Sequence, residues 1–136
     1  MKVTKLAVKL FTRAIALISF AAPLSAAPLS VQNKQFLSAY EKVHQALVAN
    51  DLAAAQKAAA DLGPSGDGLA KSKSLLEARG AFAGLSDAAR KTTAGQAGYY
   101  VVHCPMLHKD WVQTSDKISN PYGSAGLVTC GEIESK

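Results

Sequence analysis

The sequence predicts a mainly α fold, in which a small antiparallel bundle of about four helices precedes a loop-rich C-terminal segment with short β pieces. Two observations lead to this prediction. Apolar residues recur at helical spacing between residues 31 and 98, where alanine is abundant. After Gly98 the composition changes to aromatic and β-branched residues interrupted by glycine and proline, which is typical of short strands and turns.

The first 27 residues have the order of a cleaved secretory signal peptide. Four basic residues precede an apolar run over residues 14–22, and the small residues 25–27 follow it. The apolar run is shorter than the roughly 20 residues that a membrane-spanning helix needs. We therefore expect a single mature domain over residues 28–136, periplasmic or secreted and without a membrane span. Its helical bundle would occupy residues 31–98 and its cysteine-containing segment residues 99–136.

The formal net charge of +5 comes mostly from the predicted signal peptide. The whole chain has 15 basic and 10 acidic residues, and residues 1–27 contain four basic residues and no acidic ones, which leaves 11 against 10. The remaining charges are interspersed, as on an ordinary solvated surface. A nucleic-acid partner would require a clustered positive face, so we expect none.

The bundle begins with a predicted antiparallel helical hairpin over residues 34–62. Phe36, Tyr40, Val43 and Leu47 share one face of the first helix. Asn50-Asp51 interrupts this helix and offers an N-cap to the second, which is lined with alanine and ends at Gly63-Pro64. Alanine side chains allow neighbouring helices to approach closely, so we expect the two helices to pack against each other.

Two more helices are predicted before Gly98. The third runs from about Leu69 to Leu85, with Phe82 among its buried residues and two glycines that weaken its end. Ser86 is a natural N-cap for a short fourth helix that ends near Ala97.

The C-terminal segment opens with a predicted strand over residues 99–104. Further short apolar pieces follow at residues 111–113, at Ile118 and at residues 127–130, and we expect Trp111 to fill the core. Asn120-Pro121-Tyr122 is a turn signal that would fix where Cys130 returns to the strand.

No catalytic motif is present in the sequence. It contains no Gly-x-Ser-x-Gly, no His-Glu-x-x-His, no phosphate-binding glycine loop and no Cys-x-x-Cys-His for covalent haem. His103 and Cys104 are adjacent, and adjacent residues on a strand face opposite ways, so His103 is badly placed to activate the thiol. We expect the protein not to be an enzyme.

The cysteines support two hypotheses that exclude each other. Cys104 and Met106 would lie on the same side of an extended chain and offer soft sulfur ligands, with Cys130 as a second thiolate and His103 or His108 as an imidazole. Such a set would bind Cu(I) or another soft ion. Alternatively, two cysteines in an exported chain form a disulfide, which would close a loop of about 27 residues and stabilise the fold by roughly 3 kcal/mol.

The motifs resemble those of an uncharacterised bacterial extracytoplasmic domain family. The match covers almost the whole mature chain, and its most specific parts are Cys104-Pro-Met106, Asn120-Pro-Tyr122 and Cys130-Gly131. Members of that family occur alone and appended to the adaptor subunits of heavy-metal efflux pumps. The resemblance implies copper or heavy-metal handling through Cys104, Met106 and Cys130, with an efflux adaptor or a metallochaperone as partner. Here Leu127-Val-Thr precedes the last cysteine, where the family often carries a methionine.

Two functional hypotheses follow from these features. The first is a periplasmic protein that binds Cu(I) or a similar ion and is linked to metal efflux. The alternative is a disulfide-stapled structural or adaptor module that acts through protein contacts without metal.

Overall fold

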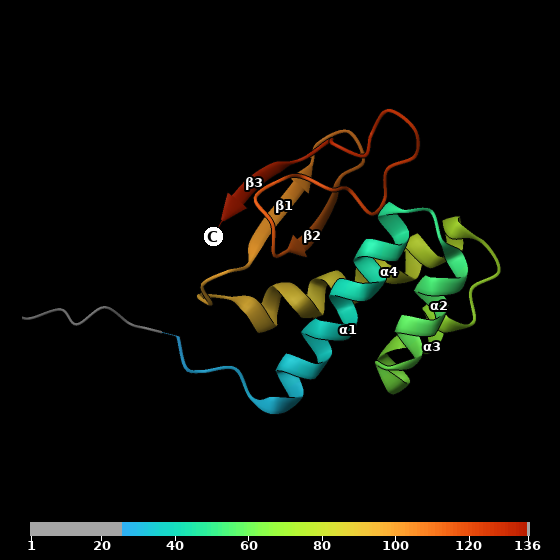
Figure 1. Cartoon of the computed structure of the whole chain (residues 1–136). Helices are drawn as coiled ribbons and strands as arrows, with labels where there is room; N and C mark the ends of the chain where they lie inside the picture. The colour runs from blue at the N-terminus through green and yellow to red at the C-terminus, as the bar shows by residue number, and fades with distance from the viewer. Residues whose placement is uncertain (1–25, 136) are drawn as a thin grey trace, which may run out of the picture.

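The computed structural model describes residues 26–135 (Figure 1). The predicted signal peptide, residues 1–27, lies almost entirely outside this range. The helices are α1 (Val31–Val48), α2 (Leu52–Ala60), α3 (Asp67–Ala70) and α4 (Leu75–Thr93), with a 3-10 turn at Gly63–Gly66. The strands are β1 (Tyr100–Cys104), β2 (Lys109–Gln113) and β3 (Glu132–Ser135).

The prediction of a mainly α fold is wrong, because the C-terminal segment forms a regular three-stranded antiparallel sheet in the order β2-β1-β3. The helices occupy one side of the molecule and the sheet the other (Figure 1). Each strand is only four or five residues long. Strands of that length show too little apolar–polar alternation to reveal a sheet, whose stability depends on pairing between distant segments.

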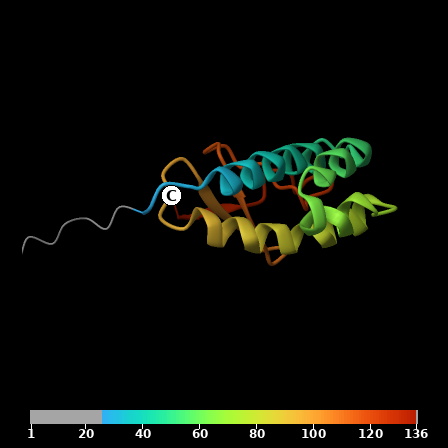
Figure 2. The same ribbon diagram turned by 90° about the horizontal axis from the view of Figure 1, so that it is seen from below.

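The predicted hairpin of the first two helices is confirmed. Ser30 Oγ accepts a hydrogen bond from Asn33 N at the start of α1, and Asp51 Oδ1 accepts one from Ala54 N, 2.9 Å away, at the start of α2. Asn50 adopts a left-handed backbone, φ 58°, in the turn between them. Figure 2 shows α1 and α4 side by side, with α2 and α3 at one end of the pair.

The predicted break at Ser86 is absent, and α4 continues through it to Thr93. The N-cap of α4 is Ser74, whose hydroxyl accepts from Glu77 N, while Glu77 Oε2 accepts from Lys73 N. Gly80 and Gly84 are tolerated inside the helix because both are exposed and neither is pressed by neighbouring atoms. The fourth predicted helix and most of the third are therefore one helix. The predicted start of the third, at Leu69, lies instead in α3, which residues 71–74 separate from α4.

Aromatic rings connect the helical layer to the sheet. Tyr40 stacks on Phe82 with ring centroids 4.9 Å apart, Phe82 meets Tyr122 at 5.7 Å, and Tyr122 meets the edge of Trp111 at 6.3 Å. Trp111 is fully buried, as the sequence predicts. This continuous core makes the helices and the sheet one packed unit.

The loop between β2 and β3 is fixed to the helices by side-chain hydrogen bonds. Arg79 of α4 donates to Pro121 O, 2.9 Å away, and to Asn50 Oδ1 at 2.6 Å. His44 Nε2 of α1 donates to Ser119 O at 2.8 Å. These bonds set the path on which the chain returns to the sheet.

Candidate functional site

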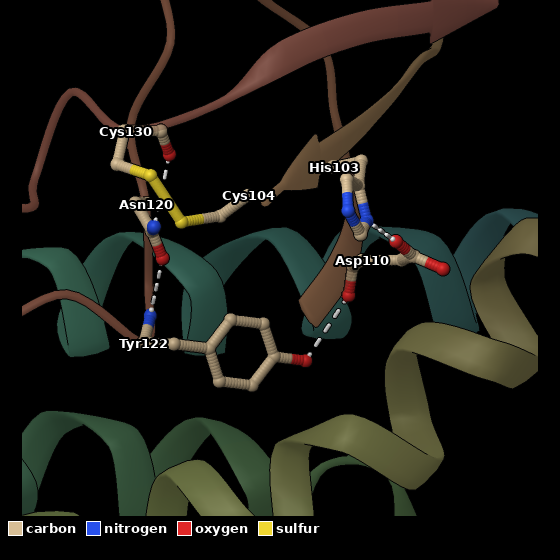
Figure 3. Close-up of a disulfide and its surroundings, with 6 residues drawn as sticks. All are labelled: His103, Cys104, Asp110, Asn120, Tyr122 and Cys130. Carbon is tan, nitrogen blue, oxygen red and sulfur yellow. Dashed lines mark hydrogen bonds and ion pairs between the residues drawn. A yellow bond between two sulfur atoms is a disulfide. The ribbon is translucent and has the colours of Figure 1, made fainter. Parts of the chain in front are cut away.

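Cys104 and Cys130 form a disulfide, with Cα atoms 5.5 Å apart (Figure 3). The bond joins the last residue of β1 to the segment just before β3. Cys104 is fully buried in the core, and Cys130 is partly buried. Of the two hypotheses for the cysteines, the structure thus contains the disulfide.

The turn at Asn120 places Cys130, as predicted. Asn120 is fully buried; its Nδ2 donates to Cys130 O at 2.9 Å and its Oδ1 accepts from Tyr122 N at 2.9 Å (Figure 3). The residue after Cys130 must be small, because a Cβ on Gly131 would lie 2.8 Å from atoms of both Trp111 and Val102. The Cys-Gly pair therefore lets the chain pass directly over the core beside the disulfide.

Of the residues predicted as metal ligands, Cys104 and Cys130 are brought together, and they are bonded to each other as a disulfide. Met106 is 70% exposed in the β-hairpin turn, where His108 is also exposed and has φ 49°, whereas Cys104 is inaccessible. His103 follows the sheet alternation to the face opposite Cys104. Between residues 26 and 135, no group of three or more His, Cys, Asp or Glu side chains is arranged to hold a metal ion.

A soft metal ion does not fit the predicted ligand set in this form. Both sulfur atoms that would coordinate it as thiolates are bonded to each other, and only the deprotonated thiol is a metal ligand. The metal hypothesis is therefore a prediction for the reduced protein.

A polar array that the sequence analysis missed lies on the other face of the sheet. The Asp110 carboxylate bonds two side chains. His103 Nδ1 lies 2.6 Å from its Oδ1 (Figure 3), and Arg90 Nη1 of α4 donates to its Oδ2, also at 2.6 Å. All three side chains are partly exposed, between 28% and 39%. The sequence feature that could have revealed this array is the four-residue turn 105–108, which makes residues 103 and 110 cross-strand partners. The array fastens the end of α4 to the sheet.

A second polar array, formed by three hydroxyl groups, is buried between α1, α4 and β2. Ser86 Oγ lies 3.0 Å from both Tyr40 Oη and Tyr122 Oη. Val112 N donates to Tyr40 Oη at 3.0 Å, and Tyr122 Oη donates to Asp110 O at 3.2 Å. Because a carbonyl only accepts and an amide only donates, the direction of every bond in the chain is fixed: amide, Tyr40, Ser86, Tyr122, carbonyl.

Tyr40 and Tyr122, the two tyrosines of this hydrogen-bonded array, stay protonated. Burial raises the pKa of Tyr40 and of Tyr122 well above the ordinary value near 10, against an opposing effect of the Ser86 hydrogen bond. Their hydroxyl groups bond two backbone groups of β2, the amide of Val112 and the carbonyl of Asp110.

A groove of about 720 Å³ lies between α4 and the sheet. It is lined by Asp87, Arg90, Lys91 and Ala94 of α4, Val101 of β1, and Glu134 and Ser135 of β3. Together with His103 and Glu132, which are cross-strand partners, it gathers titratable side chains on the face opposite the disulfide.

Comparison with protein-family models, with curated proteins and with solved structures gives no significant match to this chain. Among the helices of the described range, none is long and apolar enough to cross a membrane.

Proposed function

We propose that this chain is an extracytoplasmic, disulfide-stapled module that acts by contacting a partner protein. The observation that carries the proposal is the Cys104–Cys130 disulfide, with Cys104 sealed in the core. Disulfides persist in oxidising compartments, which agrees with the secretory signal expected at the N-terminus.

The position of the disulfide favours a structural role. Small sheets of short strands are marginally stable unless they are packed or cross-linked. The bond joins β1 to the chain directly before β3. It therefore helps to hold β3 in register with β1, since a strand of four residues forms few hydrogen bonds of its own. The closed loop spans residues 104–130, for which the chain-entropy account gives about 3 kcal/mol of stabilisation.

Metal handling, which the family resemblance implies, would need this bond to be reduced first. It would then need Cys104 to become accessible and Met106 to approach it, and the loss of the cross-link would weaken the sheet that presents them. A scaffold role requires none of these changes.

The test is a thiol count on protein exported through its own signal peptide. Alkylation under denaturing conditions followed by intact-mass measurement is compared with and without prior reduction, and Cu(I) uptake by the reduced protein is measured in parallel. We expect no alkylation before reduction, two alkylated thiols after it, and lower stability of the reduced protein.

Two variants separate the hypotheses. The Cys104→Ser/Cys130→Ser pair removes both thiols, and Met106→Leu removes only the exposed thioether. Two free thiols in the exported protein, protected from alkylation by one copper ion in a Met106-dependent way, would overturn the scaffold proposal and support metal handling.

A further inference from the structure

We propose that the outer edge of β3 is the docking strand of this module, and that its partner is an extended, basic segment of another protein, added to the sheet as a fourth strand. This inference rests on the proposed function and names the surface and the partner chemistry that it leaves open. Strand addition supplies main-chain hydrogen bonds at a sheet edge and takes specificity from the side chains beside it.

The two edges of the sheet differ in how their backbone groups are satisfied. On β2, the outward amide of Val112 and the outward carbonyl of Asp110 are bound by the hydroxyl groups of Tyr40 and Tyr122. On β3, no hydrogen bond to the outward side is found among residues 26–135. The buried polar array thus bonds two outward backbone groups of β2, whereas over the described range no such bond is found on the outer side of β3.

The register identifies which groups are available on β3. Because Val112 N is bound to Tyr40, the pair Val101–Val112 is not hydrogen-bonded, and the pairs alternate along β1. The backbone of Val102 is therefore turned toward β2, so its partner across the other interface, Ile133, has its amide and carbonyl turned outward. A partner strand would bind these two groups first.

The side chains of this edge select the charge of the partner. Glu132 is the cross-strand partner of His103, and Glu134, in the groove lining, is on the same face of the sheet. Both glutamates are exposed. Opposite charges at facing positions stabilise strand pairing and like charges oppose it. A lysine- or arginine-bearing segment is favoured, while a second copy of β3 would place glutamates against glutamates.

The groove beside α4 extends the same preference. An added strand would direct alternate side chains toward this face of the sheet. Arg90 is already paired with Asp110 at 2.6 Å. The remaining charged side chains on this side are the carboxylates of Asp87, Glu132 and Glu134 and the ammonium group of Lys91. The balance is acidic, so a basic side chain next to β3 finds carboxylates within the groove.

The short length of β3 and its register shift between Val101 and Val102 are features that discourage pairing between identical edges. They restrict the docking segment to a few residues and keep the module from assembling on itself. Charge, not edge protection alone, then decides which strand is accepted.

The experiment uses the oxidised full mature chain and a capped eight-residue peptide of alternating lysine and valine, followed by backbone amide NMR. Two control peptides match it: one with glutamate in place of lysine, and one with the same lysines and alternate backbone nitrogens methylated, which keeps the charge but blocks edge pairing. We expect the lysine peptide to shift the amides of residues 131–135 and to bind at least tenfold more tightly than either control.

A Glu132→Lys/Glu134→Lys variant should reverse the preference toward the glutamate peptide, whereas Asp61→Lys, on the distant α1–α2 side, should leave it unchanged. Equal binding of the methylated peptide, shifts away from β3, no shift at millimolar peptide, or concentration-dependent self-association through β3 would each overturn the proposal. None of these outcomes changes the thiol count, so failure of the docking strand and failure of the scaffold function are distinguishable.

Discussion

Replacing Ser86 by alanine removes the central member of the buried hydroxyl chain. In the native fold Ser86 Oγ accepts from Tyr40 Oη and donates to Tyr122 Oη, each 3.0 Å away, and all three side chains are buried. Alanine occupies nearly the same space, so the change tests the hydrogen bonds with little effect on packing.

The expected cost follows from the groups that lose partners. Two buried hydrogen bonds contribute about 0.5–1.5 kcal/mol each, and the Tyr40 hydroxyl is left without an acceptor, which raises the total to about 2–3 kcal/mol. Alanine recovers about 0.5 kcal/mol through its higher helix propensity within α4. We therefore expect the free energy of unfolding to fall by about 2 kcal/mol.

Urea unfolding of the oxidised protein measures this change. With a denaturant dependence of about 2 kcal/mol per M, the midpoint should fall by about 1 M. The matched control is Ser38→Ala on the exposed face of α1, which should be neutral or slightly stabilising. The decisive comparison is Ser86→Ala in a Tyr40→Phe/Tyr122→Phe background, where Ser86 has lost both partners. A cost there equal to that in the native background would refute the network, because a true network predicts no cost or a gain.

Two further predictions concern the same core. Burial raises the pKa of both Tyr40 and Tyr122, so above about pH 10 the unfolded chain loses protons that the folded chain keeps, and stability should fall by up to about 1.4 kcal/mol per pH unit for each tyrosine. Urea midpoints between pH 9 and 11.5 should show this fall, and Tyr122→Phe should roughly halve its slope; an unchanged slope would contradict it. Gly131→Ala should lower the free energy of unfolding by about 1–3 kcal/mol, because its Cβ would lie 2.8 Å from Trp111, whereas Gly84→Ala, in open space within α4, should raise it by about 0.5–1 kcal/mol. Thermal or urea unfolding of the two variants checks both signs, and an equal response would contradict the packing argument.

The sequence was most informative where local chemistry decides the structure. The hairpin of α1 and α2, its Asp51 cap, the buried Trp111 and the role of Asn120 in placing Cys130 were all predicted from short-range signals. Each depends on a side chain that bonds or packs within its own segment or at a turn of known chemistry.

The predictions were wrong where the conformation of a residue depends on contacts with segments distant in the sequence. Ser86 has the local character of an N-cap, yet its hydroxyl bonds Tyr40, 46 residues earlier, and Tyr122, 36 residues later. β3 was missed because a four-residue strand with two exposed glutamates has almost no apolar pattern of its own. Its place in the sheet comes from pairing with β1, which the disulfide and the Asn120 turn enforce.

These features connect the disulfide to the proposed docking strand. Cys130 is two residues before β3, and Gly131 between them packs closely on Trp111, so the cross-link fixes the chain at the point where β3 begins. A sheet that is held in this way can present an edge strand without burying it. Reduction should therefore loosen β3 before the helices, because α1, α2 and α4 pack through Tyr40, Phe82 and the alanine faces without either cysteine. If the module docks its partner through β3, the redox state of one buried bond controls whether the docking strand is formed.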